Sequence, residues 1–301
     1  MTITDWILLL ILSLLWGGSF FFVEVALTGL PVFTIVFLRV FLGALILRGF
    51  LLISGKKLPR DRVIWRRLFI MGLLNNAVPF CLIVTGQQFI NGGFASIING
   101  TTPFFTVLAA HFFTRDEKIN TRKIAGVILG ITGVVVLIGF ESLQKGSHKL
   151  WGALAVVGAA LSYSLAGVWG KGFKKLGLDP ALTATGQLLC SSLLLFPVML
   201  LVDKPWQLNL PGLDVWAALL GIALFSTALA YIIYFKILSS SGATNVLLVT
   251  FLVPVSAVLL GVLFLSEEFK LQYLYGMLAI GMGLVFIDGR IPAKIRKKFR
   301  G

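Results

Sequence analysis

"IINGTTPFF" (residues 97–105) interrupts a stretch that is otherwise apolar enough to cross a membrane. It places Asn99, Thr101 and Thr102 directly before Pro103, near the middle of the apolar segment. A proline inside a helix frees a backbone carbonyl, and an unsatisfied polar group is costly in hydrocarbon. Irregular backbone at membrane depth is tolerated where it is buried in protein or lines a water-filled cavity. The stretch therefore predicts a broken spanning helix whose break faces the protein interior.

The composition predicts an all-α polytopic membrane protein. Of the 301 residues, 58% are hydrophobic and 13% are charged, whereas a soluble domain carries about 25% charged residues. A spanning helix needs about 20 mostly apolar residues. Ten segments meet this requirement, and they leave no room for a soluble domain: 6–27, 31–53, 68–88, 92–113, 121–140, 150–171, 180–202, 213–235, 243–265 and 271–289.

The positive charges predict the orientation of the chain. If the N-terminus is cytoplasmic, 21 of the 26 Lys and Arg residues fall on the cytoplasmic side and Arg39 falls within a span. The remaining four fall on the outer side: Lys145, Lys149, Lys204 and Lys270. Cytoplasmic loops of membrane proteins carry the excess of Lys and Arg. We therefore expect both termini in the cytoplasm, and we interpret the net charge of +14 as a consequence of topology rather than of nucleic-acid binding.

The two halves of the chain repeat each other at an offset of about 150 residues. Pro103 corresponds to Pro254 in "VTFLVPVSA" (249–257), and an apolar run and an acidic pair follow each proline. Such self-similarity indicates an internal duplication. The remaining matches are Asp116-Glu117 with Glu267-Glu268, Trp16 with Tyr163, Pro31 with Pro180, and Gly126, Gly130 and Gly133 with Gly276, Gly281 and Gly283.

Each repeat contains five spans, so the two copies must cross the membrane in opposite orientations. We assign residues 1–146 to the first repeat, 147–289 to the second, and 290–301 to a basic cytoplasmic tail. Inverted repeats are a common plan of secondary transporters, whose substrate sites lie near the midplane between the repeats. The predicted fold is two inverted five-helix repeats around a central cavity.

Several segments resemble the drug/metabolite transporter superfamily, and specifically its EamA type. The resemblance rests on "LLWGGSFFFVE" (14–24), "FLRVFLGALIL" (37–47), "ASIINGTTPFFTVLAAHFFTRDEK" (95–118), "IAGVILGITGVVVLI" (124–138) and "VTFLVPVSAVLLGVLFLSEE" (249–268). It covers nearly the whole chain and is weak for substrate. It implies an inner-membrane protein of bacteria that exports amino acids, other metabolites or drugs from the cytoplasm.

Polar residues within the spans are the candidates for the substrate cavity. Asn99, Thr101 and Thr102 offer hydrogen-bonding groups beside a proline break; the alternative is that they join helices to one another. Pro103 and Pro254 are expected to act as hinges or kinks rather than as contacts.

Further cavity candidates lie on four other spans. Asn75 and Asn76 are adjacent, so they point about 100° apart on an α-helix. One is expected to face the cavity while the other bonds to a neighbouring helix. Trp16 and Tyr163 occupy matching positions in the repeats, and Tyr231 also lies within a span. Their rings could stack on a substrate.

Arg39 is the charged residue within a span, and an intramembrane charge is by default a functional hypothesis. It is expected either to form a structural pair, with Glu24 as the candidate partner, or to attract a substrate carboxylate. Glu24 is also a candidate proton site, together with His111 and Glu268.

Other functions find little support in the sequence. A membrane enzyme would need a nucleophile with a base, paired acids or a metal cluster, and a channel would need a ring of like groups. We expect no catalytic residue, cofactor or metal, and read Cys81 and Cys190 as apolar filler. The expected partners are a small-molecule substrate and the bilayer, with no nucleic acid. The chain is expected to be a monomer or a homodimer. Export of amino acids or related metabolites is preferred over efflux of lipophilic or cationic drugs.

Overall fold

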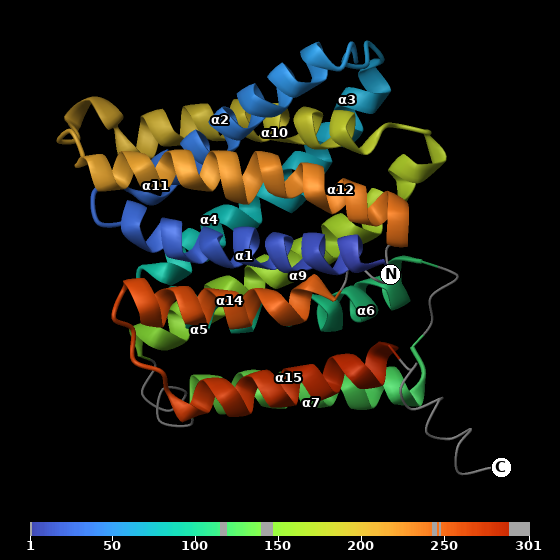
Figure 1. The fold of residues 1–301 in the computed structure, drawn as a ribbon, viewed down its shortest axis with the longest axis vertical. Coiled ribbons are helices and arrows are strands. Elements are labelled where there is room, and N and C mark those ends of the chain that lie inside the picture. Colours follow the sequence, from blue (N-terminus) through green and yellow to red (C-terminus); the bar gives the residue numbers. More distant parts are fainter. Residues whose placement is uncertain (1, 115–118, 140–146, 243–245, 247, 289–301) are drawn as a thin grey trace.

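The protein is a bundle of helices arranged in layers (Figure 1). The computed structural model describes residues 2–114, 119–139, 147–242, 246 and 248–288. Within these residues eight helical stretches are long and apolar enough to cross a membrane, and two shorter apolar helices, Val249–Phe264 and Leu271–Ile287, complete the set. The expected all-α fold of ten membrane segments is thus confirmed. Asp116-Glu117 and the tail at 290–301 lie outside the described residues.

In its described residues, the first repeat contains seven α-helices and one π-helical segment. Its elements are α1 (Ile3–Ala26), α2 (Val32–Ile53), α3 (Arg62–Gly72), the π-helix η1 (Leu73–Ala77), α4 (Val78–Gln87), α5 (Gly92–Asn99), α6 (Thr102–Phe113) and α7 (Thr121–Ile138).

The second repeat follows the same order within the described residues. Its elements are α9 (His148–Lys175), α10 (Pro180–Val198), the π-helix η2 (Met199–Asp203), the 3₁₀ turn η3 (Pro205–Gln207), α11 (Leu213–Ala223), the π-helix η4 (Leu224–Leu229), α12 (Ala230–Ser241), α14 (Val249–Phe264) and α15 (Leu271–Asp288).

Helix starts follow from residue types that satisfy free backbone N–H groups. Asp61, Asn91, Asn120 and Asp179 each accept a hydrogen bond from a backbone N–H in the first turn of the helix that follows. Prolines stand where α2 and α10 begin, at Pro31 and Pro180, and so the two repeats start their second spans alike.

The helix contacts follow a pseudo-two-fold relation between the repeats. Helix α1 packs on α14 and on α11 and α12; correspondingly α9 packs on α6 and on α4. Helix α2 contacts η4, and α10 contacts η1. The equivalent helices α2 and α10 pack on each other, as do α7 and α15, and Figure 1 shows these two pairs near opposite edges of the bundle. The two repeats are therefore interlocked rather than placed end to end.

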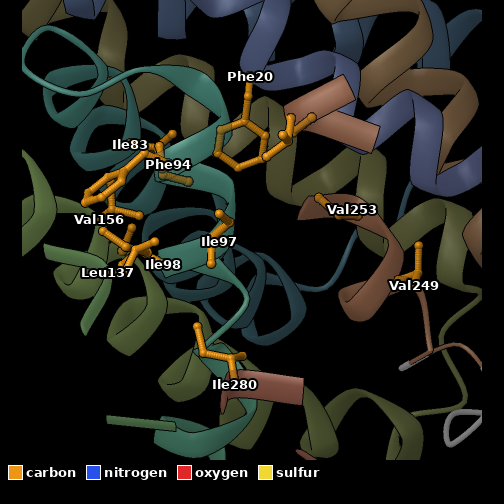
Figure 2. Packing of buried hydrophobic residues seen from close by; sticks show 14 of the residues in the cluster. Phe20, Ile83, Phe94, Ile97, Ile98, Leu137, Val156, Val249, Val253 and Ile280 are labelled. Carbon is orange, nitrogen blue, oxygen red and sulfur yellow. The ribbon is translucent and has the colours of Figure 1, made fainter. Parts of the chain in front are cut away.

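The core is divided into two apolar clusters. The larger one surrounds α5, where Figure 2 shows Phe94, Ile97 and Ile98 among side chains of other helices, including Val156. The second cluster lies between α1, α2, α4, α10 and α11. Tyr163 on α9 packs against both clusters, so it lies at the boundary between them.

Glycines let α7 and α15 approach at backbone distance. A Cβ atom added to Gly283 would lie 2.6 Å from the carbonyl oxygen of Gly126, and one added to Gly126 would lie 2.6 Å from the carbonyl oxygen of Gly283. Gly133 makes a similar close approach to α15. These glycines therefore pack two helices of the same chain closely against each other.

Replacing Gly283 by alanine is expected to destabilise the protein by about 1–3 kcal/mol, because the backbone of α7 cannot yield to the added methyl group. Gly281→Ala on the same helix is the matched control, since its Cβ would meet no atom within 4 Å. That control is expected to be neutral or stabilising by about 0.5–1 kcal/mol, from the gain in helix propensity. Thermal unfolding of the purified protein in detergent measures both; equal effects would contradict the close contact.

Candidate functional site

The break at residues 97–105 satisfies its own backbone. Helix α5 ends at Asn99 and α6 begins at Thr102. Pro103 removes the N–H that would have bonded to the carbonyl of Asn99. The hydroxyl of Thr102 donates to that same carbonyl at 2.7 Å, and the hydroxyl of Thr101 donates to the carbonyl of Ile98 at 2.6 Å. In this structure the two threonines therefore compensate for the break, and Thr101 is buried at 2% exposure.

Asn99 differs from the two threonines because its side-chain oxygen is buried without a hydrogen-bond partner among the described residues. Beside it the two repeats meet: a Cβ atom added to Gly100 would lie 3.5 Å from Cγ of Pro254. Pro254 lies inside α14, which continues through it, whereas Pro103 stands at the start of a new helix. The two prolines are thus equivalent in sequence and different in effect.

A polar network centred on Tyr231 crosses from repeat to repeat. The Tyr231 hydroxyl accepts hydrogen bonds from the side-chain amides of Asn75 (3.4 Å) and Gln187 (3.2 Å), and donates one to Oδ1 of Asn76 (3.2 Å). Asn75 also donates to Oε1 of Gln187, and Asn76 donates to the hydroxyl of Ser191 at 3.2 Å. Asn76, Gln187 and Ser191 are buried. The network joins η1 to α10 and α12.

Asn75 and Asn76 both reach the Tyr231 hydroxyl, and Asn76 also bonds to Ser191 on the neighbouring helix α10, as expected for one of the two. Both residues lie in the π-helical segment η1, where the backbone bonds i to i+5. That the other asparagine faces a cavity stays a prediction.

Arg39 lies in a second polar contact between the repeats. Its Nε donates to the hydroxyl of Thr227 in η4 at 3.3 Å, and its guanidinium carbon lies 3.7 Å from the ring centroid of Phe80. The side chain is 7% exposed. The expected pairing with Glu24 is not formed: no carboxylate of the described residues lies within ion-pair distance of Arg39.

In each of the two polar contacts, a glycine allows the helices to approach closely. A Cβ atom on Gly43, one turn beyond Arg39, would lie 2.8 Å from Cγ2 of Thr227. A Cβ atom on Gly72 would lie 2.6 Å from the carbonyl oxygen of Gln187 and 2.9 Å from the hydroxyl of Ser191. A glycine thus allows close approach in both the α2–η4 and the α10–η1 contact, on α2 in the first and on α3, next to η1, in the second.

Aromatic rings line the region between these contacts. Trp16 is half-buried, and its ring lies 5.7 Å from that of Tyr234. Tyr163 meets Phe80 edge to face at 6.5 Å, next to Arg39. Trp16 and Tyr163 are thus both in the interior, but each contacts a different ring.

Glu24 forms a carboxyl pair at one end of the bundle. Its Oε2 accepts a hydrogen bond from the backbone N–H of Gly92 at 2.7 Å, and its carboxyl lies near that of Glu267 in the α14–α15 loop. Two neighbouring carboxylates repel each other, which favours the protonated form of one of them. Burial and the neighbouring Glu24 raise the pKa of Glu267 to about 7. Of the two other candidate proton sites, Glu268 is exposed, and His111 accepts a hydrogen bond from the N–H of Ile119.

Sequence reasoning missed five residues of these contacts. The repeat offset could have found two, because Gln187 falls beside the position equivalent to Arg39, and Thr227 falls opposite Asn76. Glu267 was recognised only as part of an acidic pair, and nothing in the sequence singles out Phe80. The five missed residues are Phe80, Gln187, Ser191, Thr227 and Glu267.

No metal or redox centre is found in the part of the chain that the structure describes. It contains no group of three His, Cys, Asp or Glu side chains placed to hold a metal. Cys81 and Cys190 are free thiols.

A bundle of two interlocked five-span repeats with a polar centre at their seam defines a membrane transporter fold. The sequence profile described as "EamA-like transporter family" matches residues 5–139 and again 150–288, so the chain belongs to this family, within the drug/metabolite transporter superfamily. It is therefore a multi-span membrane protein.

Individual relatives agree with this assignment. The chain is 29% identical over 278 residues to the uncharacterized transporter YoaV of Bacillus subtilis, covering 90% of this chain and 92% of that protein. It is 30% identical over 255 residues to the protein PecM of Dickeya dadantii (84% and 83% covered) and 26% identical over 290 residues to the uncharacterized inner membrane transporter YedA of Escherichia coli K12 (94% and 91% covered). A crystal structure 18% identical in sequence matches with a TM-score of 0.68 over 94% of this chain and 96% of its own; it supports the fold.

Tyr231→Phe is expected to destabilise the protein by about 1–3 kcal/mol, because the buried amides of Asn76 and Gln187 lose their common partner. Tyr275→Phe on α15 is the control, since Tyr275 is 54% exposed. Thermal unfolding in detergent measures both. If the two variants behave alike, the hydroxyl does not hold the network together.

The carboxyl pair predicts that stability falls as the pH rises through about 7. The folded protein binds a proton on Glu267 that the unfolded chain releases near pH 4.5, so raising the pH between these values favours unfolding. Glu267→Gln keeps a neutral hydrogen-bonding group and is expected to flatten the dependence. Glu268→Gln should retain it. Melting temperatures measured from about pH 5 to about pH 8 test this prediction. If the melting temperature of Glu267→Gln changes with pH as steeply as that of wild type, the carboxyl pair is not the cause.

Proposed function

We propose that this protein is a secondary transporter that exports amino acids or related small metabolites across the bacterial inner membrane by alternating access. The observation that carries the proposal is the pair of polar contacts, α2–η4 and α10–η1, at the seam between the repeats of a transporter fold. Substrate sites of inverted-repeat transporters lie at such a seam. The proposed orientation, with both termini in the cytoplasm, rests on the charge distribution.

Rocking of one repeat against the other would open this seam. The hydrogen bonds Asn75–Gln187, Asn76–Ser191 and Arg39–Thr227 each join one repeat to the other. Breaking them exposes donors and acceptors that a polar solute can satisfy. The broken helix α5–α6, with its self-satisfied backbone, supplies a point of bending that costs no further hydrogen bond.

The polar lining favours a metabolite over a lipophilic cation. Arg39 repels a positive charge, while the amides of Asn75, Asn76 and Gln187 match the hydrogen-bonding groups of a small polar solute. The rings of Trp16 and Tyr163 fit either class of substrate. Efflux of lipophilic drugs is therefore the second candidate, and a channel or a membrane enzyme is a remote one.

Counterflow in proteoliposomes tests the substrate class. Vesicles loaded with unlabelled amino acids, organic acids, nucleosides or a lipophilic cation such as tetraphenylphosphonium would be diluted into the labelled compound. Transient accumulation of a labelled amino acid or organic acid, lost in Gln187→Ala, supports the proposal. Accumulation of the lipophilic cation alone would replace it by drug efflux, and uptake without counterflow would indicate a channel.

Cysteine labelling tests alternating access. In a Cys81→Ala, Cys190→Ala background, Asn99→Cys and Thr102→Cys are expected to react with a membrane-impermeant thiol reagent from either side of the membrane. Ile98→Cys, at 0% exposure, should stay unreactive. If the first two positions are never labelled, or are labelled from one side alone, the seam does not alternate.

A further inference from the structure

Arg39 is a buried cation near the middle of a membrane span. It is the eighth residue of the 22-residue helix α2, on the order of 11 Å from the start of the helix. At 7% exposure it is largely removed from solvent, and it lies too deep for its head group to reach the membrane surface easily.

The surroundings of Arg39 leave its charge uncompensated. The guanidinium carries five N–H donors, and among the described residues only Nε is bonded, to the neutral hydroxyl of Thr227. The face of Phe80 attracts the cation, and Tyr163 and Tyr231 lie near enough to act on it electrostatically. None of these groups carries a negative charge at neutral pH. A buried charge without a counter-charge is costly, so the fold retains Arg39 at the expense of its own stability.

The equivalent contact of the other repeat shows that the charge is not required for packing. Between α10 and η1, Gln187 and Ser191 bond to Asn75 and Asn76 and carry no charge. Gly72 permits that close approach as Gly43 permits the approach at Arg39. The same helix crossing is therefore built once with neutral groups and once with a cation.

We propose that Arg39 is the substrate-recognition residue of the transporter and that it pairs with a carboxylate of the transported solute. The planar guanidinium matches a carboxylate bidentately, with donors that are free in the ligand-free protein. A monocarboxylate anion leaves the buried site neutral, and the carboxylate of a zwitterionic amino acid pairs with the guanidinium, whereas a doubly charged phosphate would leave a net negative charge in the site. The inference rests on the proposed function and narrows its substrates to monocarboxylates and amino acids.

The stability of the ligand-free protein gives the first test. Arg39→Met keeps the length of the side chain and its contact with the Phe80 ring but removes the charge. It is expected to raise the melting temperature of the ligand-free protein by a few degrees, while Arg39→Lys, which keeps the charge, is not. A lowered melting temperature in Arg39→Met that Arg39→Lys restores would overturn the proposal, because it would show a structural cation.

Matched ligands give the second test. Sodium benzoate and L-leucine would be compared with their amides, benzamide and L-leucinamide, at constant ionic strength. The acids are expected to raise the melting temperature of wild type but not of Arg39→Met, since a ligand stabilises the state that it binds. Arg48→Met, which removes one positive charge elsewhere on α2, should keep the response. The assignment would be overturned if an acid and its amide raised the melting temperature of wild type equally. It would also be overturned if neither acid raised the melting temperature of wild type more than that of Arg39→Met.

Failure of the site and failure of the transport function are distinguishable. Carboxylates that stabilise wild type through Arg39 without counterflow would leave the recognition site standing and remove the transport proposal. Counterflow of a solute that has no carboxylate, at the same rate in Arg39→Met as in wild type, would leave the transport proposal standing and remove the recognition site.

Discussion

A polar group that this chain carries into the hydrocarbon is costly unless it finds a hydrogen-bond partner within the protein. The rest of the structure depends on how this is achieved. At Pro103 the solution is local, because the hydroxyl of Thr102 bonds to the carbonyl that the proline frees. At η1 and η4 it is tertiary: π-helical turns present amide and hydroxyl side chains to the second span of the opposite repeat. The local hydrogen bonds at Pro103 stabilise a break within one span, and the hydrogen bonds of η1 and η4 join the two repeats.

The two contacts between the repeats pair equivalent elements and differ in charge. A glycine allows close approach in each, Gly43 on α2 and Gly72 on α3, and polar residues fill both. One contact is a set of neutral groups around Tyr231, and the other contains the cation Arg39. A duplicated chain can keep one copy of a contact for packing while the other copy acquires a specificity. On our proposal, the contact with Arg39 is the copy that serves recognition.

The sequence predicted most of the fold and less of the site, for physical reasons. Ten apolar segments and the repeated prolines predict the spans and their duplication, because both depend on local composition and order. The side-chain partners depend on helix phase and on crossing geometry. Asn75 and Asn76 of η1 share one partner, the Tyr231 hydroxyl, and the packing of α2 placed Arg39 against Thr227 and Phe80 instead of Glu24. Thr101 and Thr102 were expected to line the cavity; in this structure their hydroxyls bond to the backbone.

The distribution of strong and weak contacts suits a protein that changes between two states. At one edge of the bundle α7 and α15 touch at backbone distance through Gly126 and Gly283, and such close packing has no alternative arrangement nearby. At the centre, side-chain hydrogen bonds join the repeats, and in membranes these contribute about 0.6 kcal/mol each on average. A few such bonds hold a seam closed yet exchange readily for bonds to a solute. Because the amides of Asn75, Asn76 and Gln187 lose little when a polar ligand replaces their protein partners, the same groups can hold the repeats together and bind a solute when the repeats separate.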